Sequence, residues 1–393
     1  MYTKIVGTGS YLPKKVLTND DIAQLVDTND EWIRERTGIQ SRHIVEDETT
    51  VTMASMAAKD ALENANLQPE DIDLIIVATV SADNLLPSTA CSVQKELGAV
   101  NATAFDINAA CSGFLFALNT ADAYIKTGMY KNALLIGVET LSKIVDWNDR
   151  GTCILFGDGA GAAVVAASKT PGILAGIQGA DGAGGDVLAC KGRENNNPIV
   201  KGDLTPGYVS MEGQSVFKFA VKKVPECIDE VLNKAGKNID DVELFVLHQA
   251  NLRILTSISK RKKIPMDKIP VNLDTCGNTS AASVPILLDK VNKEGKIKNI
   301  MSGTFSNCQF LKDVRFCDSV ENVQNNSMSN DVSLKYIDIP DICTINQNFA
   351  YGVLTIPVKY RDSFSELSDS CIVKMTEDNI SLCSAIFFIC KSS

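Results

Sequence analysis

The sequence repeats itself once, and this duplication limits the folds that the chain can adopt. Residues 57–79 resemble residues 227–249 at an offset of 170, and both stretches predict an amphipathic helix, an acidic turn and a buried strand. A second match has an offset of 167 and relates a predicted helix over 111–127 to one over 278–294. The repeat therefore predicts two βαβα halves packed together in an α/β fold.

The duplication also places three polar side chains where α/β proteins bind ligands. Under the 167 offset, Cys111 and Asn278 occupy the same position in each half, where a strand turns into the N-terminus of a buried helix. Under the 170 offset, His248 ends the strand that corresponds to the one ending at Ala78. Ligand sites gather where strand C-terminal ends meet helix N-termini, so these three residues are candidates for chemistry.

Each candidate has a structural alternative. A thiol at a helix N-terminus feels the helix dipole and free backbone amides, which predicts a lowered pKa for Cys111, whereas the alternative is a buried inert cysteine. His248 could be a hydrogen-bonded core histidine, and Asn278 a helix N-cap. The glycine-rich run 156–165 matches no nucleotide-binding fingerprint and predicts a tight hairpin that lets backbones approach closely.

Charge and cysteine usage exclude other classes of protein. The 393 residues carry a formal charge of -10 and a pI of about 4.9, which argues against a nucleic-acid-binding protein. No apolar run reaches the roughly 18 residues that span a bilayer, and the N-terminus has no signal-peptide pattern, so we expect a cytoplasmic protein. The twelve cysteines include no CxxC pair, so we expect neither a disulfide framework nor a metal site.

One basic run opposes the acidic character of the chain. Five basic residues and no acidic one lie between positions 251 and 263, immediately downstream of His248. A solvated helix face is the alternative, but a basic patch beside a site would suit an acidic carrier or a phosphate-bearing substrate. The five residues are Arg253, Lys260, Arg261, Lys262 and Lys263.

Residues 1–300 resemble the β-ketoacyl-acyl-carrier-protein synthases III, which start fatty-acid chains. Several long motifs match in the same order along the chain. They are Asp-Glu-Trp-Ile-Arg-Glu-Arg-Thr-Gly-Ile at 30–39, the Cys111 segment, Arg-Gly-Thr-Cys-Ile-Leu-Phe-Gly-Asp-Gly-Ala-Gly-Ala at 150–162, Met-Glu-Gly-Gln-Ser-Val-Phe-Lys-Phe-Ala-Val at 211–221, His-Gln-Ala-Asn at 248–251 and Gly-Asn-Thr-Ser-Ala-Ala-Ser at 277–283. The resemblance implies a thiolase-like αβαβα layered sandwich.

The resemblance implies a Claisen condensation of a short acyl-CoA with malonyl-acyl-carrier protein, releasing CO2 and CoA. Cys111 would be the acylated nucleophile, while His248 and Asn278 would bind the thioester carbonyl during decarboxylation. Acyl-CoA is a substrate, and neither a metal nor another cofactor is implied. The implied partners are acyl-CoA, the acyl carrier protein and a second copy of the chain, because Leu86 lies where a partner residue often reaches the acyl pocket.

The resemblance also implies residues that bind CoA and the carrier protein. Trp32 and Arg150 would flank the adenine. The pantetheine and phosphate route would be lined by Thr28, Arg36, Gly213, Ala250 and Asn251. The docking face for the carrier protein would comprise Lys218, Arg253, Lys260, Arg261, Lys262 and Lys263.

The sequence departs from the family near residue 300. Family members end with a glycine-rich turn and a last apolar strand, and polar sequence stands here instead. In the family that turn supplies one oxyanion-hole amide beside the nucleophile, a donor worth about 3–4 kcal/mol. We therefore predict an N-terminal half over 1–170, a truncated second half over 171–303 and an atypical tail over 304–393.

The tail has an unusual composition and no recognised domain signature. Residues 303–393 hold six of the twelve cysteines but two of the 26 glycines. Two explanations stay open: a frameshift or gene-boundary error, or a true extension that covers an exposed sheet edge. Three functions stay open as well: the condensing enzyme, a related acyltransferase or secondary-metabolite ketosynthase, and a catalytically impaired acyl-CoA-binding protein.

Overall fold

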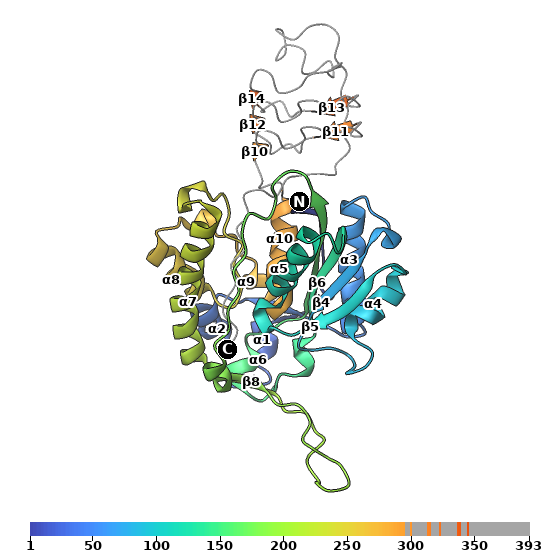
Figure 1. Cartoon of the computed structure of the whole chain (residues 1–393). Helices are drawn as coiled ribbons and strands as arrows, with labels where there is room; N and C mark the ends of the chain where they lie inside the picture. Colours follow the sequence, from blue (N-terminus) through green and yellow to red (C-terminus); the bar gives the residue numbers. More distant parts are fainter. Residues whose placement is uncertain (295–298, 301–312, 316–321, 324–335, 339–343, 346–393) are drawn as a thin grey trace.

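A computed structural model describes residues 1–294 and five short strands beyond them (Figure 1). The expected position of the glycine turn, near 303–307, lies outside the described residues, as does most of the tail. The domain boundaries at 170 and 303 stay a prediction. No helix in the described part has both the length and the apolar character needed to span a bilayer.

The first half builds a five-stranded sheet with the strand order β1-β7-β6-β4-β5. Strand β7 is antiparallel to both of its neighbours, whereas β6, β4 and β5 run parallel. Every residue of β4 is buried, as expected for a strand with both faces covered. The strands are β1 (Tyr2–Tyr11), β4 (Leu74–Ala78), β5 (Thr103–Ile107), β6 (Asn132–Glu139) and β7 (Gly159–Ser168).

Helices from both halves cover this sheet. Helices α3 (Thr50–Asn64) and α4 (Thr89–Leu97) pack on one face (Figure 1). Helices α5 (Gly113–Lys126) and α10 (Ser283–Lys293) pack on the other. Because α5 belongs to the first half and α10 to the second, the two halves share the central helix layer.

The second half keeps the layered packing, but the strand predicted before His248 belongs to none of the sheets that the described residues form. Segment 244–247 lies between the central layer and an outer pair of helices, α7 (Gly213–Ala235) and α8 (Leu252–Lys262). Its side chains alternate: Leu244 and Val246 pack with α5 and α10, while Phe245 and Leu247 pack with α7 and α8. This is strand-like burial. Within the described residues, however, the segment joins no sheet.

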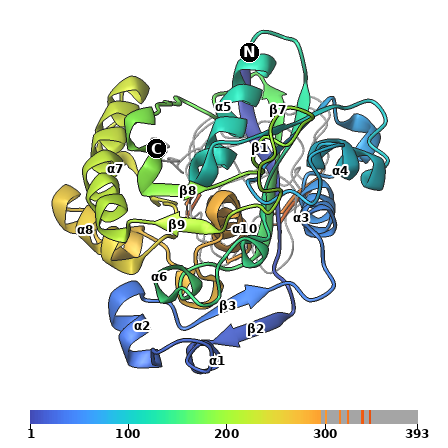
Figure 2. The same ribbon diagram turned by 90° about the horizontal axis from the view of Figure 1, so that it is seen from below.

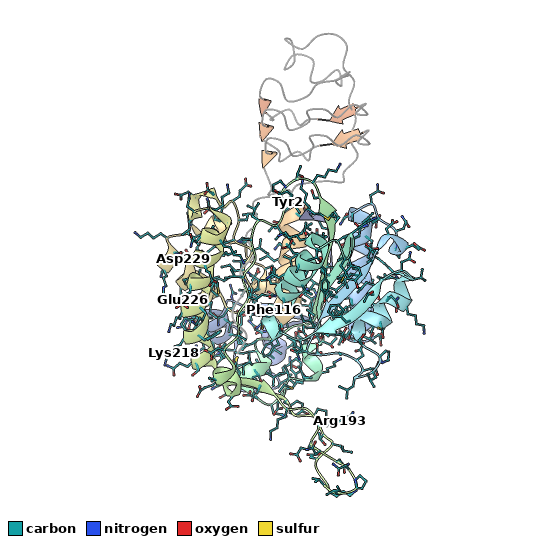
Figure 3. All side chains as sticks on the ribbon, in the orientation of Figure 1. Tyr2, Phe116, Arg193, Lys218, Glu226 and Asp229 are labelled. Carbon is teal, nitrogen blue, oxygen red and sulfur yellow. The ribbon has the colours of Figure 1, made fainter. Side chains whose placement is uncertain are left out.

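Shorter elements complete the described part. The antiparallel pair β2–β3, with α1 and α2, lies at the edge seen in Figure 2, and β8–β9 carry the loop that projects beyond Arg193 in Figure 3. The remaining elements are β2 (Lys15–Thr18), α1 (Asn19–Ile22), α2 (Asp30–Thr37), β3 (Ser41–Ile44), α6 (Arg150–Cys153), β8 (Leu188–Cys190), β9 (Val209–Met211) and α9 (Leu273–Cys276).

The structure supports the duplication and corrects its alignment at the site. The 3-10 turns η1 (Pro69–Asp71) and η5 (Ile239–Asp241), 170 residues apart, are the predicted acidic turns. Turns η2 (Ala110–Ser112) and η7 (Ser280–Ala282) are also 170 apart, and each begins with a positive φ, 44° and 47°. Cys111 therefore corresponds to Ala281 and not to Asn278. The 167 offset matches only the C-terminal ends of helices α5 and α10. Their N-terminal ends are 170 residues apart, and α10 is three residues shorter than α5.

Glycines in the central sheet let the second half approach closely. A Cβ atom on Gly137 of β6 would overlap the carbonyl oxygen of Ala281, and one on Gly161 of β7 would overlap the backbone of α10. The predicted close approach is present, but the predicted hairpin is not. The run 156–165 leads into strand β7 itself, and a long connection separates β7 from β6.

The strands beyond residue 294 have a regular spacing. Parallel strands β10 (Asn299–Ile300), β12 (Asn322–Val323) and β14 (Thr344–Ile345) pair at offsets of 23 and 22 residues. Strands β11 (Asp313–Arg315) and β13 (Tyr336–Asp338) pair at an offset of 23 (Figure 1). A fixed period of this length is typical of repeat proteins.

The sequence of the tail carries the same period. Identical residues recur 23 positions apart at Asn299 and Asn322, Ser306 and Ser329, Leu311 and Leu334, and Lys312 and Lys335. The tail is therefore repetitive sequence, and both explanations of its origin stay open.

The contact at Gly137 gives a test of the packing between the halves. We expect Gly137→Ala to lower the free energy of unfolding by about 1–3 kcal/mol, because the new methyl group meets rigid backbone. Urea unfolding followed by circular dichroism measures the change. Gly182→Ala is the matched control, since nothing lies within 4 Å of its Cβ position. Equal stability of the two variants would contradict this account.

Candidate active site

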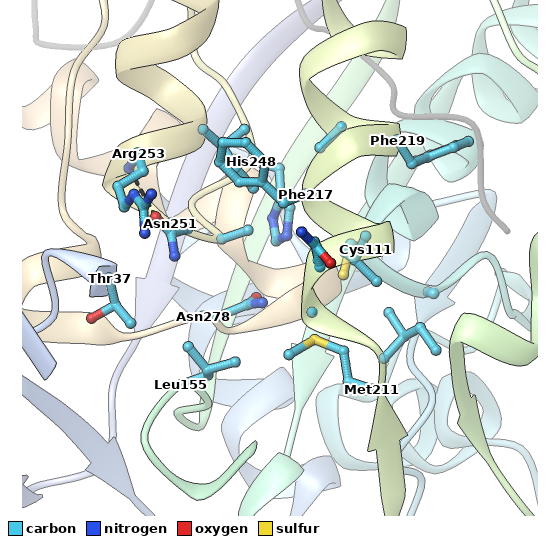
Figure 4. Close-up of a pocket in the computed structure, with 18 of the residues that line it drawn as sticks. Thr37, Cys111, Leu155, Met211, Phe217, Phe219, His248, Asn251, Arg253 and Asn278 are labelled. Atoms are coloured by element: carbon cyan, nitrogen blue, oxygen red, sulfur yellow. Dashed lines mark hydrogen bonds between the residues drawn. The ribbon is translucent and has the colours of Figure 1, made fainter. Parts of the chain in front are cut away.

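The three residues predicted to carry chemistry line one pocket. Its volume is about 750 Å³, and its wall includes Cys111, His248 and Asn278, which Figure 4 shows converging from three separate segments. The other polar and apolar lining residues come mainly from the start of α7 and from the segment after His248. Residues of both halves thus form one concave site.

Cys111 lies in turn η2, directly before helix α5. Burial raises the pKa of its thiol to about 11, and the carboxylate of Glu139 adds to the increase. Hydrogen bonds from the Ser280 side chain and from the backbone amide of Cys111 offset this only in part. The predicted lowering of the pKa is therefore wrong, because desolvation of the thiolate outweighs the helix amides. The resting thiol is protonated at neutral pH.

His248 follows the buried segment 244–247 and faces the same pocket. Burial lowers its pKa to about 4, so the imidazole is neutral at pH 7. Its backbone is held by Gln249, whose N–H donates to Ser283 Oγ at 2.8 Å and whose side-chain amide donates to Leu247 O at 2.9 Å. Among the described residues, Nδ1 of His248 has no hydrogen-bond partner.

Asn278 caps the turn that precedes α10. Its Oδ1 accepts from the backbone N–H of Ser280 at 2.9 Å, which orders turn η7. The N-cap of α10 itself is Ala282, so Asn278 is not the helix N-cap considered as its alternative role. Since Oδ1 is engaged with the turn, the Nδ2 amide is the donor that Asn278 can offer to the pocket.

The residues predicted to bind CoA divide into two groups. Four of them line the pocket: Arg36, Gly213, Ala250 and Asn251. Trp32, Arg150 and Thr28 lie outside its lining. The guanidinium groups of Arg36 and Arg150 nevertheless stack on the Trp32 ring, at 4.2 and 4.8 Å from its centroid, so this trio links to the pocket through Arg36.

The residues predicted to dock a carrier protein also divide. Lys218 and Arg253 line the pocket, and Arg253 stacks on Phe217 at 5.9 Å. Lys260, Arg261 and Lys262 form the last turn of α8, and Lys263 caps that helix. These four lie outside the pocket lining, and Lys262 is paired with Asp229.

Other residues of the site escaped the sequence reasoning. Part of the pocket wall is apolar, with Met211, Phe217 and Phe219 among its members (Figure 4), and no period in the sequence marks them. Glu139 and Ser280 lie behind Cys111. Glu139 carried a usable signal, because a carboxylate that follows the apolar run 133–138 of strand β6 is unusual in a buried position.

Metal ligands are not gathered anywhere in the described part. No group of three or more His, Cys, Asp and Glu side chains in it is arranged to hold a metal ion. The six cysteines described there, which include Cys111, are all free thiols.

Comparisons with known proteins identify the family. The model of the 3-oxoacyl-[acyl-carrier-protein (ACP)] synthase III family matches residues 105–182, and the model of its C-terminal part matches residues 232–306. A β-ketoacyl-[acyl-carrier-protein] synthase III of Clostridium acetobutylicum is 50% identical over 297 residues, 75% of this chain and 91% of that protein. One of Caldanaerobacter subterraneus subsp. tengcongensis is 52% identical over 298 residues, with 75% and 90% covered.

Solved structures confirm the predicted fold class. The 3-oxoacyl-[acyl-carrier-protein] synthase III of Aquifex aeolicus VF5 matches with a TM-score of 0.70 and 50% identity, covering 75% of this chain and 92% of that one. The priming β-ketosynthase of the R1128 polyketide pathway also has a TM-score of 0.70, at 37% identity, covering 76% and 89%. With three quarters of its length aligned at about half identity, the chain belongs to the β-ketoacyl-acyl-carrier-protein synthase III family.

Proposed function

We propose that this chain is the condensing enzyme of fatty-acid initiation, an acyltransferase that joins a short acyl-CoA to malonyl-acyl-carrier protein. The observation that carries the proposal is the convergence of a thiol, a neutral imidazole and a carboxamide in one pocket of about 750 Å³. This set of groups suits the formation of an acyl-cysteine, followed by decarboxylation of an extender.

In the first step, the sulfur of Cys111 attacks the thioester carbonyl of acyl-CoA, and CoA leaves as the thiol. The tetrahedral oxyanion needs nearby N–H donors. The backbone amide of Cys111 already donates to its own thiol, so it lies near the position where this oxyanion would form.

In the second step, the malonyl thioester loses CO2 and its carbonyl becomes an enolate. Neutral His248 and the Nδ2 amide of Asn278 would donate hydrogen bonds to that oxygen. A protonated imidazole would be costly in this apolar site, and its low pKa keeps His248 neutral. The enolate carbon then attacks the acyl carbonyl on Cys111 and the bond between that carbon and Sγ breaks. Cys111 is released as the thiolate, and the 3-oxoacyl carrier-protein thioester leaves.

The surface around the pocket supports the partners in this proposal. Trp32 with its two stacked arginines offers an aromatic and cationic site for the adenine and phosphates of CoA. Lys218 and Arg253 at the pocket would attract an acidic carrier protein, whereas the 260–263 cluster would act at longer range. Acyl-CoA is a substrate in this scheme, which uses no metal.

A homodimer is also part of the proposal. Strand β5 is at one edge of the sheet, where it could pair with a second copy. Leu85 and Leu86, next to the same region, are 85% and 87% exposed, which is unusual for adjacent leucines unless they are covered by a partner. A cytoplasmic location stays a prediction.

A priming ketosynthase of secondary metabolism is the second candidate, because such an enzyme matches with the same TM-score as the Aquifex protein. Both candidates acylate Cys111. They differ in the starter and in the carrier that accepts the product.

Acylation of Cys111 tests the first step. Incubation with isotopically labelled acetyl-CoA should place the label on Cys111, located by peptide mass spectrometry, and Cys111→Ala should abolish it. Cys91→Ala is the matched control, since Cys91 is an exposed free thiol outside the pocket. Label that survives in Cys111→Ala would contradict the assignment, and absence of label from the wild type would favour an acyl-CoA-binding protein.

Decarboxylation tests Asn278. Asn278→Asp keeps the Oδ1 acceptor that orders turn η7 but removes the Nδ2 donor, so CO2 release from malonyl-acyl-carrier protein should fall by about 10²–10³-fold. Acylation of Cys111 should persist in this variant. Asn101→Ala, which removes an exposed amide outside the pocket lining, is the control. Decarboxylation at the wild-type rate in Asn278→Asp would overturn the assigned role.

Tryptophan fluorescence tests the adenine site. The sequence has two tryptophans, Trp32 and Trp147, so Trp147→Phe isolates the signal of Trp32. Titration with CoA should quench this signal, because adenine would stack on the ring in place of a guanidinium. Trp32→Phe, which retains Trp147, should lose the quench. A quench of the same size in Trp32→Phe would show that adenine binds elsewhere.

A further inference from the structure

A buried carboxylate lies behind the nucleophile and is not used by the mechanism above. Glu139 ends strand β6 and is fully buried. Its side chain accepts hydrogen bonds from the backbone N–H of Val80 at 3.1 Å and from the hydroxyls of Ser81 and Thr79. The loop after β4 thus holds the carboxylate in a fixed place at the base of the site.

Ser280 connects this carboxylate to the nucleophile. Its hydroxyl is a hydrogen-bond partner of both Cys111 and Glu139, and with its single proton it can donate to the carboxylate while its oxygen accepts from the thiol. The backbone amide of Ala281 also donates to Glu139. Ser280 has a φ of +47°, a strained value for a residue with a side chain, and such strain is concentrated at functional sites. The missing side chain of Gly137 lets this turn come close to β6.

The pKa values of Cys111, Glu139 and His248 favour transfer of the thiol proton toward Glu139 over its transfer to His248. Burial raises the pKa of Glu139 to about 7, so the carboxylate is substantially ionised at neutral pH. Burial lowers the pKa of His248 to about 4, which makes its imidazole a weak base toward a thiol with a pKa of about 11. Of the two groups, Glu139 is therefore the stronger base.

We propose that Ser280 relays the proton of Cys111 to Glu139 when the nucleophile is activated. The Sγ–H bond breaks as Ser280 Oγ takes the proton, and the Ser280 hydroxyl proton passes to a carboxylate oxygen of Glu139. The products are a Cys111 thiolate and a neutral Glu139. Glu139 acts only through Ser280, so it is a positioning residue that also stores the proton. This inference rests on the proposed role of Cys111 as the nucleophile.

Other charged groups are close enough to matter. The thiol of Cys111, on η2, is the titratable group that interacts directly with Glu139. One hydrogen-bond layer farther out, Lys143 and Asp83 form an ion pair at 3.1 Å, and both bond to Thr50. Thr50 donates to Ser81 O at 2.8 Å. This ion pair holds the outer layer of the network in place.

Alkylation of Cys111 by iodoacetamide tests the relay without any acyl substrate, so its outcome is independent of the proposed condensation. The rate for Cys111, read by peptide mass spectrometry between pH 5.5 and 9.5, should rise through an inflection near pH 7 and then level off. In Glu139→Gln this inflection should vanish, and the rate at pH 8 should fall by about 100-fold. The exposed thiol of Cys91 is an internal reference in each sample.

Faster alkylation of Cys111 in Glu139→Gln would overturn the proposal. If Glu139 only repelled the thiolate, its removal would lower the pKa of Cys111 and speed alkylation. Ser280→Ala, which keeps the carboxylate, should behave like Glu139→Gln and provides a second variant should one of them fail to fold. Asp158→Asn is the matched control, because Asp158 is a buried carboxylate held by Val45 N and Ser142 N. An unchanged inflection in Ser280→Ala would also refute the relay.

Discussion

The close approach of turn η7 to strand β6 is the contact on which the site depends. Gly137 has no side chain, so the backbone of Ala281 can lie against the sheet, and this brings the second half down onto the first. Turn η7 then meets turn η2, which carries Cys111. The same turn is ordered by Asn278. One backbone contact therefore sets the distance between the nucleophile and the groups from the other half.

Burial is the second determinant of the site, and it acts on each titratable group in the direction that removes charge. It makes the thiol of Cys111 and the carboxyl of Glu139 weaker acids and the imidazole of His248 a weaker base. A neutral imidazole is a hydrogen-bond donor for an enolate, but a protonated thiol is a poor nucleophile. The site thus needs a route for the proton of Cys111, which the Ser280 contact supplies in our proposal.

The described residues show the sheet of the first half more fully than that of the second. The first half forms a complete five-stranded sheet. In the second, segment 244–247 keeps the alternating burial of a strand without a ladder among the described residues. Apolar side chains packed on two helix layers hold this segment, and His248 follows it into the pocket. Beyond residue 294 the strands follow a period of 22–23 residues, which belongs to a different architecture.

The sequence by itself determined the duplication, the fold class and the residues that converge on the pocket, because repeats, apolar periodicity and long motifs are local patterns. The resemblance to the family also named Arg36 and Asn251, which line the pocket, and their role in binding stays a prediction. The tertiary structure alone decided which positions correspond between the halves. Helix α10 is three residues shorter than α5, and the sequence around Cys111 and Asn278 gives no sign of this difference. The tertiary structure also gave Cys111 a raised pKa where the sequence predicted a lowered one, and it placed the buried Glu139 near the nucleophile. Both results depend on desolvation by atoms that are far apart in the sequence and that only folding brings together.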